Sequence, residues 1–201
     1  MKKLDEIRKV AAHYLSQPAV QLLARTHITP NAVTWLGFWL AVIAAVLIGI
    51  GDLLAAGFVV LVGGFFDMLD GALARHTNQA SRFGSVLDST LDRAAEAVLL
   101  LGILTFYALN ASESSVAVVL LTSVAMIGSF LVSYVRARME AAGLECKVGL
   151  FTRTERVVVL ALGLLLSQIS YALITALAII AFFSFLTAGQ RLIEARHQTK
   201  K

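Results

Sequence analysis

Six long apolar segments, separated by short polar connections, dominate this chain of 201 residues. A helix needs about 20 residues to cross the hydrocarbon core of a bilayer, and a backbone in that core must satisfy its own hydrogen bonds. The pattern therefore predicts an all-α integral membrane protein with six transmembrane helices, of which the fifth is the shortest. The six segments cover residues 32–51, 53–74, 84–109, 116–135, 157–167 and 170–188.

Composition excludes a water-soluble fold and gives no indication of a disulfide or a zinc site. Apolar residues make up 58% of the chain and charged residues 15%, whereas soluble domains contain about 45–50% and about 25% respectively. The single cysteine, Cys146, cannot form an internal disulfide, and no Cys/His spacing indicates zinc. The sequence contains no internal repeat or linker, so we expect residues 1–201 to form one domain, with the six-helix bundle over 32–192.

The segment before the first apolar run has a pattern of its own. Within residues 1–26, apolar side chains recur at helical spacing while lysines and arginines fall elsewhere on the wheel. This pattern predicts an N-terminal amphipathic helix that lies in the membrane interface. The alternative is an amphipathic helix packed on the surface of the protein itself. Thr29 and Pro30 then suit the N-cap and the first position of the first spanning helix.

Lysines and arginines are distributed asymmetrically around the six segments. All 17 precede the first segment, follow the last, or surround the second and fourth connections between segments. The opposite connections carry only acids, Asp52 and Glu113. Because basic residues mark the cytoplasmic side, we expect a multi-pass plasma-membrane protein with both termini in the cytoplasm. The net charge of +4 then reflects orientation in the lipid bilayer rather than nucleic-acid binding.

Four aspartates occur as pairs on the second and third segments. Asp67 and Asp70 are three residues apart, so they share one face of a helix, and the same holds for Asp88 and Asp92, four apart. A carboxylate near the bilayer centre costs about 2.5–3.5 kcal/mol. A hard divalent cation relieves the repulsion of clustered carboxylates, and oxygen ligands favour magnesium, manganese or calcium over zinc. The alternative is that ion pairs with nearby arginines neutralise them: Arg75, Arg82 and Arg93.

These aspartates belong to a longer motif, D-x2-D-G-x2-A-R-x8-G-x3-D-x3-D, which runs from Asp67 to Asp92. The motif resembles the signature of the CDP-alcohol phosphotransferases. These membrane enzymes transfer a phosphatidyl or related group from a CDP-linked donor to an alcohol and release CMP. The predicted six-helix layout is similar as well. The resemblance implies a homodimer with one active site in each subunit, open to the cytoplasm.

The resemblance also implies roles for individual residues. It implies a two-metal site for Mg²⁺ or Mn²⁺, whose ligands would be Asp67, Asp70, Asp88 and Asp92. Asp92 would in addition be the catalytic general base that takes the proton of the attacking hydroxyl. The CDP part of the donor would be bound by two groups of residues, namely Thr29, Pro30, Asn31 and Ala32, and Gly71, Arg75 and Ser81.

Arginines gather at the predicted cytoplasmic ends of the last three segments, and guanidinium groups bind phosphate in bidentate fashion. The sequences over 81–93, 133–144 and 153–156 resemble those of bacterial phosphatidylinositol phosphate synthases, a subgroup of the family. The subgroup implies CDP-diacylglycerol as donor and 1D-myo-inositol 3-phosphate as acceptor. It departs from this chain at Thr154, where the subgroup commonly has proline. The acceptor phosphate would contact Ser133, Arg138, Arg153, Arg156 and Arg191.

Two other functions are compatible with these residues. The same chemistry can use glycerol 3-phosphate or another alcohol as acceptor, or an archaeal diether lipid as donor. A divalent-cation transporter also needs carboxylates inside the membrane. Transporter sites, however, typically lie near the midplane on broken helices related by repeat symmetry. In this chain the aspartates lie at helix ends and no repeat is visible, which favours the transferase.

Overall fold

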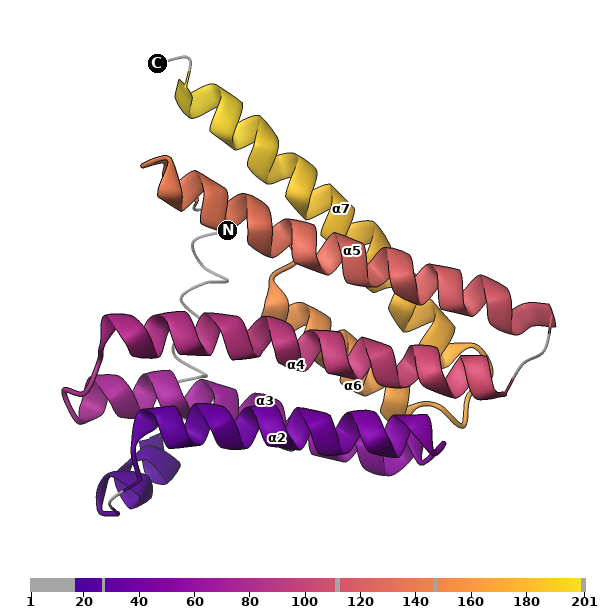
Figure 1. Cartoon of the computed structure of the whole chain (residues 1–201), viewed down its shortest axis with the longest axis horizontal. Helices are drawn as coiled ribbons and strands as arrows, with labels where there is room; N and C mark the ends of the chain where they lie inside the picture. Colours follow the sequence, from indigo (N-terminus) through magenta and orange to yellow (C-terminus); the bar gives the residue numbers. More distant parts are fainter. Residues whose placement is uncertain (1–16, 27, 111–112, 147, 200–201) are drawn as a thin grey trace.

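The computed structural model describes residues 17–26, 28–110, 113–146 and 148–199 of the chain. The regular secondary structure of these residues is entirely helical, as the sequence predicts. Each of the six apolar segments overlaps one helix (Figure 1). In chain order the helices are α2 (Pro30–Gly49), α3 (Leu53–His76), α4 (Arg82–Leu109), α5 (Glu113–Ala141), α6 (Arg153–Leu165) and α7 (Ala172–Thr199).

Side-chain caps fix where α2 and α4 begin. Thr29 is the N-cap of α2, where its hydroxyl oxygen accepts a hydrogen bond from the Ala32 amide at 3.3 Å, and Pro30 follows in the first turn. Ser81 caps α4 in the same way, with 2.9 Å between its hydroxyl oxygen and the Gly84 amide. Such caps satisfy amides that have no partner within the helix. The predicted start of the first spanning helix is therefore confirmed.

Among the described residues, four helices are long and apolar enough to cross a membrane: α2, α3, α7 and the part of α5 from Val116 to Ala141. They identify a helical membrane protein. The other two helices of the bundle, α4 and α6, differ from them. α4 carries charged residues through its first half. α6 has 13 residues, which extend about 20 Å at 1.5 Å per residue, less than the roughly 30 Å of a hydrocarbon core.

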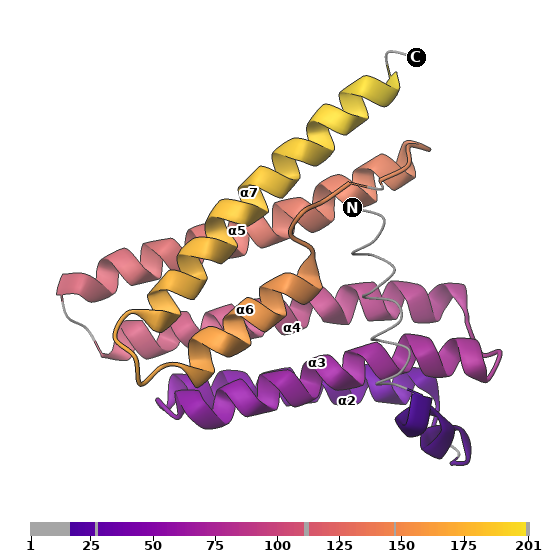
Figure 2. The same cartoon turned by 180° about the vertical axis from the view of Figure 1, so that it is seen from behind.

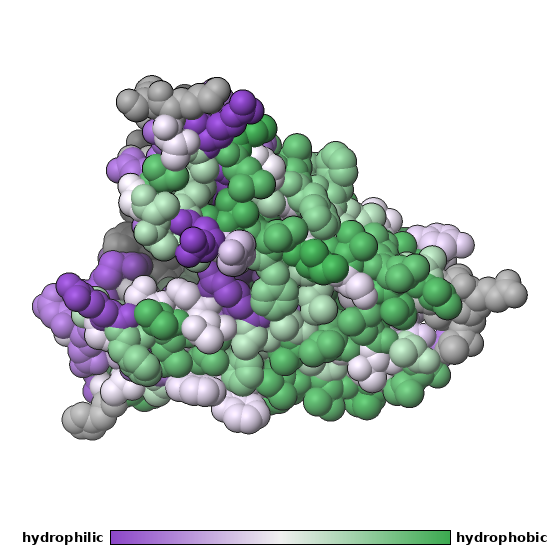
Figure 3. All heavy atoms as spheres, turned by 45° about the horizontal axis from the view of Figure 1, so that its top comes forward, coloured by the Kyte–Doolittle hydropathy of each residue, from purple (hydrophilic) through white to green (hydrophobic). Residues whose placement is uncertain are grey.

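The surface of the bundle is divided by polarity. Hydrophilic residues gather around the connection between α3 and α4 and around the C-terminal ends of α5 and α7 (Figure 3). Most of the remaining surface in this view is hydrophobic. Large apolar side chains such as Trp39, Val46 and Phe182 are more than half exposed on the bundle, as is expected of a surface that faces lipid tails.

The helices form two groups with α6 between them (Figures 1 and 2). α2 packs against both α3 and α4, and α5 packs along α7. α6 contacts α3 on one side and α7 on the other, while α4 contacts α5. Both views show α5 and α7 diverging from α3 and α4 toward the end where the chain finishes. The two groups are therefore joined through α6 and through the contact of α4 with α5.

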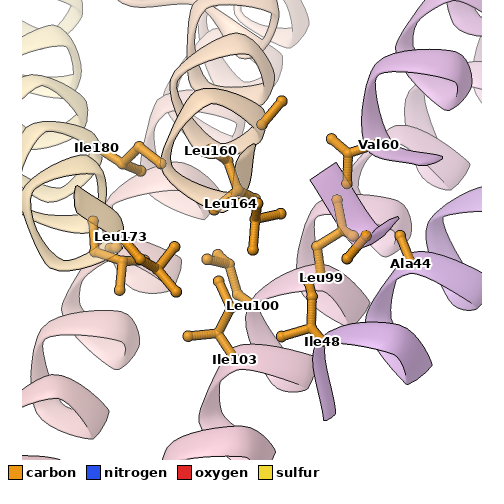
Figure 4. Packing of buried hydrophobic residues seen from close by; sticks show 14 of the residues in the cluster. Ala44, Ile48, Val60, Leu99, Leu100, Ile103, Leu160, Leu164, Leu173 and Ile180 are labelled. Atoms are coloured by element: carbon orange, nitrogen blue, oxygen red, sulfur yellow. The ribbon is translucent and has the colours of Figure 1, made fainter. Parts of the chain in front are cut away.

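The core lies where the two groups meet. Ile48, Ile103 and Leu164, from α2, α4 and α6, have no exposed surface. Figure 4 shows these side chains pointing toward one another, with Leu173 of α7 close to them. Lipid tails are as apolar as leucine, so close packing rather than exclusion from water holds such a region together. The polar end of the bundle is thus supported by a tightly packed middle.

The N-terminal segment is described in part. Residues 17–24 are helical, and Val20 packs against Val33 of α2 and Leu69 and Leu73 of α3. This part of the predicted amphipathic helix therefore rests on the protein, next to the start of α2. Residues 1–16, which carry most of the predicted interfacial pattern, lie outside the described residues.

Candidate active site

Three aspartates of the motif converge at the polar end of the bundle. Asp67 and Asp70 lie on one face of α3, because they are three residues apart, and Asp88 lies in the second turn of α4. One carboxylate oxygen from each lies within 4.8 Å of the others. The connection 77–81 between the two helices is short. The structure thus brings together three of the four aspartates that the sequence singles out as metal ligands.

Asp70 has the environment expected of a metal ligand. Its side chain is 5% exposed, and its Oδ1 accepts a hydrogen bond from the Gly71 amide at 2.5 Å. Its Oδ2 is buried and has no hydrogen-bond partner, which is costly for a carboxylate. A cation held by the three carboxylates would satisfy this oxygen. A donor set made only of carboxylate oxygens fits a hard ion such as Mg²⁺ or Mn²⁺.

Asp92 lies beside this group, close to Asp67 and Asp88, and is paired with an arginine of α6. Nη1 of Arg153 lies 2.7 Å from Oδ1 of Asp92 and 2.5 Å from Oδ2 of Asp67. One guanidinium nitrogen therefore bridges a carboxylate of the three-aspartate group and the fourth aspartate. The ion-pair partner of the motif is thus Arg153, which lies 86 residues after Asp67. The arginines closest in sequence are not the ones that the structure pairs with Asp67 and Asp92.

A cavity of about 210 Å³ adjoins the aspartates and is lined by α2, α3, α4 and the connection before α4. We refer to it as the α2–α4 cavity. Its walls contain five of the seven residues predicted to bind CDP, namely Pro30, Asn31, Gly71, Arg75 and Ser81, together with Asp70 and Asp88. The other two, Thr29 and Ala32, do not line it. They form the N-terminal cap of α2, which positions Pro30 and Asn31.

Gly84 allows the first turn of α4 to lie close to the start of α2 beside this cavity. A Cβ atom at this position would lie 3.0 Å from Oγ of Ser81 and 3.2 Å from Oδ1 of Asn31. A side chain here would therefore press on the cap of α4 and on the α2 residue that faces it. The glycine of the motif keeps the first turn of α4 close to the start of α2, and the α2–α4 cavity depends on that distance.

A second cavity, of about 120 Å³, opens where α4, α5, α6 and α7 meet. We refer to it as the arginine cavity. Four of the five residues predicted to bind the acceptor phosphate line it: Ser133, Arg153, Arg156 and Arg191. Asp92 lines it as well, so the predicted base faces the cavity that holds the arginines. The remaining walls come from Arg93, Glu96, Val132, Arg136 and Thr152.

The two most buried arginines of this cavity are already held in place. Arg191 is 4% exposed, and its guanidinium donates to the carbonyl of Val132 at 2.6 Å and to the carbonyl of Val148 at 3.1 Å. Arg156 is 2% exposed and donates to Glu96 through two nitrogens, at 2.5 and 2.9 Å. Fixed guanidinium groups of this kind recognise phosphate with little loss of side-chain freedom.

Gly149 allows the connection between α5 and α6 to pass close to the guanidinium of Arg191. Its φ of +153° lies in a region that favours glycine, and a Cβ atom here would lie 2.9 Å from Nη2 of Arg191. The connection between α5 and α6 can therefore pass close to the guanidinium only because this position has no side chain. Two segments far apart in the sequence thereby meet around one arginine.

Of the two residues on α5 that were predicted to bind the acceptor phosphate, Ser133 lines the arginine cavity and Arg138 does not. Ser133 and Arg136 are three residues apart, share a face, and both line the arginine cavity. Arg138 is exposed and lies outside the described lining of that cavity. Arg136 and Glu96 line the cavity but were not among the predicted site residues. The helical period would have indicated both, because Arg136 shares a face with Ser133 and Glu96 follows Asp92 by four residues.

The start of α6 shows how the chain manages without proline at position 154. The Glu155 carboxylate accepts hydrogen bonds from the Thr152 hydroxyl and, at 2.7 Å, from the Thr152 amide. This capping box fixes the first turn of the helix. It places Arg153 and Arg156 three residues apart on one face, with Thr154 exposed. Side-chain capping thus supplies the defined helix start that a proline in the first turn also favours.

Comparisons with known proteins agree with this site. The profile of the CDP-alcohol phosphatidyltransferase family matches residues 27–188. The chain is similar to a phosphatidylinositol phosphate synthase of Mycobacteroides abscessus, with 37% identity over 90% of this chain and 84% of the relative. It is also similar to an archaetidylinositol phosphate synthase of Pyrococcus horikoshii, with 35% identity over 87% of each chain.

Solved structures give the same result. The crystal structure of the Mycobacterium tuberculosis phosphatidylinositol phosphate synthase with CDP-DAG bound superposes with a TM-score of 0.80 at 33% identity, covering 90% of this chain and 92% of that one. The structure of the same enzyme with manganese and citrate gives a TM-score of 0.81 at 34% identity, covering 90% and 88%. Membership of a family of transferases explains the clustered carboxylates as part of a transferase site. The alternative function of a cation transporter is therefore not required to explain them. The chain is therefore a membrane transferase that belongs to the CDP-alcohol phosphatidyltransferase family.

Proposed function

We propose that the chain transfers a phosphatidyl group from CDP-diacylglycerol to 1D-myo-inositol 3-phosphate, giving phosphatidylinositol phosphate and CMP. The observation that carries this proposal is the arrangement of two cavities around α4. One is lined by Asp70, Asp88 and most of the residues predicted to bind CDP, and the other is lined by five arginines together with Asp92. The names of the M. abscessus and M. tuberculosis relatives support the same reaction.

The donor would bind in the α2–α4 cavity with its acyl chains in the surrounding lipid. Asp67, Asp70 and Asp88 would hold Mg²⁺ or Mn²⁺, and Asp92 lies beside them. The manganese complex of the M. tuberculosis enzyme and the unpartnered Oδ2 of Asp70 support this assignment. When bound, the ions neutralise the pyrophosphate and make CMP a better leaving group. Arg75 and Gly71, which line the cavity, would bind and admit the CDP phosphates.

The acceptor would bind in the arginine cavity, where Ser133, Arg153, Arg156 and Arg191 would hold its phosphate. Asp92 would take the proton of the attacking hydroxyl. The hydroxyl oxygen then forms a bond to the phosphorus of the phosphatidyl group, and the bond from that phosphorus to CMP breaks. Asp92 lines the arginine cavity and lies beside the carboxylates, so in this proposal it would lie between nucleophile and donor.

The membrane arrangement is part of the proposal. All six helices α2–α7 would cross or enter the bilayer as one domain over residues 1–201, with both termini and the two cavities on the cytoplasmic side of the plasma membrane. The short α6 would span only part of the hydrocarbon core. Residues 1–26 would lie at the interface, and two copies would form a homodimer. The one-sided distribution of lysine and arginine supports this orientation.

A panel of acceptors tests the function. Purified protein would be given CDP-diacylglycerol, Mg²⁺ and one acceptor at a time: inositol 3-phosphate, free inositol, glycerol 3-phosphate or no acceptor. We expect release of CMP with inositol 3-phosphate only, and a lipid product that carries a phosphorylated inositol by mass spectrometry. Activity with glycerol 3-phosphate and none with inositol 3-phosphate would contradict the proposal.

The donor needs an experiment of its own, since one relative is an archaetidylinositol phosphate synthase of P. horikoshii. The same assay would compare CDP-diacylglycerol with its diether counterpart. We expect a higher kcat/KM for the diacyl donor. A preference for the diether lipid would leave the reaction unchanged but would assign the archaeal-type donor.

A further inference from the structure

A carboxylate outside the motif holds one of the arginines that the proposed function places at the acceptor phosphate. Glu96 of α4 accepts hydrogen bonds from Nε of Arg156 at 2.5 Å and from Nη2 at 2.9 Å. The side chains of Arg156 and Glu96 are 2% and 11% exposed, which makes this the most buried of the ion pairs among the described residues. Two parallel hydrogen bonds fix the plane of a guanidinium as well as its position.

The pairing leaves one guanidinium nitrogen available. Nη1 of Arg156 is buried and has no hydrogen-bond partner in the described structure, and Arg156 lines the arginine cavity next to Arg191. A buried donor on a permanent cation is costly to leave unpaired. An anionic oxygen in the cavity would supply the missing partner. Glu96 thus determines which nitrogen of Arg156 meets the ligand.

Glu96 also connects this arginine to the helix of the predicted base. It follows Asp92 by four residues, so both lie on one face of α4. Arg153 and Arg156 lie three residues apart on α6. Two successive ion pairs therefore link the helices, Arg153 with Asp92 at 2.7 Å and Arg156 with Glu96. Through the second pair, α4 sets the position of a phosphate-binding group relative to Asp92.

Resting on the proposed function, we propose that Glu96 is a positioning residue for the acceptor. It holds Arg156 so that Nη1 meets the acceptor phosphate while the acceptor hydroxyl lies at Asp92. It acts through Arg156 and makes no contact with the CDP donor. Its negative charge also offsets one of the arginines, which would otherwise repel one another in the cavity before the phosphate enters.

The test is the steady-state kinetics of Glu96→Gln. Glutamine has the same shape but cannot accept both hydrogen bonds, so Arg156 loses its fixed orientation. We expect the KM for inositol 3-phosphate to rise about tenfold, the change produced by losing one such hydrogen bond. The KM for CDP-diacylglycerol should change by less than about twofold. A purely structural role would reduce the amount of active enzyme, which lowers the maximal rate and leaves both KM values unchanged.

Asp52→Asn is the control. Asp52 caps α3 at the end far from both cavities, where its Oδ1 accepts a hydrogen bond from the Ala55 amide at 3.2 Å. Loss of this carboxylate should therefore keep both KM values within about twofold of the wild type. An unchanged acceptor KM in Glu96→Gln, at any maximal rate, would overturn the proposal.

Two further variants keep the result decisive. If Glu96→Gln does not fold, Glu96→Asp retains the charge but cannot reach both nitrogens, and an acceptor KM equal to that of the wild type would overturn the proposal. In an Arg156→Gln background, adding Glu96→Gln should leave the acceptor KM unchanged, because the two residues act as one unit. A further rise would show that Glu96 does not act through Arg156, and it too would overturn the proposal.

The two proposals fail in different experiments. The proposed function fails on the wild-type enzyme, if inositol 3-phosphate releases no CMP. In that case the same variants would be measured with the phosphorylated alcohol that the wild type does accept. The role of Glu96 then fails only if its substitution leaves the KM for that alcohol unchanged.

Discussion

The α2–α4 cavity and the arginine cavity both reach α4, but their charged groups are held in different ways. In the first, three carboxylates lie within 4.8 Å of one another and a buried oxygen of Asp70 has no partner. In the second, Arg156 and Arg191 are already bound by a carboxylate and by backbone carbonyls. The proposed cation would complete the first cavity, whereas the arginines of the second are held in place without a ligand.

Because of this difference, we expect substitutions in the two cavities to change different kinetic parameters. Substitutions at the carboxylates should change the metal requirement or the maximal rate, because these groups contribute when charge is neutralised or a proton moves. Substitutions around the arginines should change the KM of the acceptor, because the ligand proposed for that cavity is charged before and after reaction. Four substitutions, with effects from large to small, test this division.

The largest effect is expected from Asp92→Asn, which removes the predicted base at the border of the two cavities. The kcat for CMP release should fall by about 10³-fold, within the range found for general bases. The Kd for CDP, measured by calorimetry, should stay within about twofold of the wild type, since Asp92 lies outside the α2–α4 cavity lining. An equal loss of CDP binding would place Asp92 among the donor-binding residues instead.

Asp70→Asn should change the metal requirement. The Mg²⁺ concentration that gives half-maximal activity is expected to rise about 10- to 100-fold, because an amide replaces the most buried charged ligand. Activity is followed by CMP release during Mg²⁺ titration after treatment with a chelator. Asp52→Asn is the control, since Asp52 caps α3 at its far end. An unchanged Mg²⁺ dependence in Asp70→Asn would mean that the cation binds elsewhere.

Arg191→Lys should affect the acceptor alone. Lysine keeps the charge but cannot donate to the carbonyls of Val132 and Val148 and still present a planar group to phosphate. The KM for inositol 3-phosphate should rise about tenfold, with the donor KM unchanged. Arg196→Lys, an exposed position on the same helix, should behave as the wild type. A change in the donor KM of Arg191→Lys would contradict the assignment of donor and acceptor to separate cavities.

Gly149→Ala should have the smallest effect. Its Cβ would lie 2.9 Å from Nη2 of Arg191, so the guanidinium must shift, and we expect about a threefold rise in acceptor KM. The free energy of unfolding should fall by about 1 kcal/mol because of the unfavourable φ. Gly143→Ala separates the two effects, since Gly143 has a φ of +73° and no neighbour within 4 Å of a Cβ. It should be destabilised with no change in KM; a KM change in both variants would refute the role of the Arg191 contact.

Much of the fold could be predicted because apolar length is a local property of the sequence. The residues at which the helices begin and end were harder to predict from the sequence. α5 and α7 continue beyond their apolar segments to Ala141 and Thr199, since a helix that leaves the membrane can continue in water when its residues favour the helix. α6 begins at Arg153, four residues before its apolar segment, because the capping box of Thr152 and Glu155 starts it there.

The site was predictable where its residues are close in sequence. The spacing of Asp67, Asp70 and Asp88 within one motif was enough to place them together. The pairing of Arg153 with Asp67 and Asp92 was not predictable, because it depends on how α6 packs against α3 and α4. The roles of the individual aspartates, and whether Asp92 also ligates metal, remain predictions that the variants above address.

The buried pair of Glu96 and Arg156 has a consequence for how this family can diverge. Replacing either residue alone leaves a charge without its partner in a site with almost no solvent, and such uncompensated charges are strongly destabilising. Positions 96 and 156 are therefore expected to change together between relatives. Where a relative accepts an alcohol without a phosphate, loss of the arginine should be accompanied by loss of the acid, so that co-variation of these two positions becomes a marker of acceptor choice.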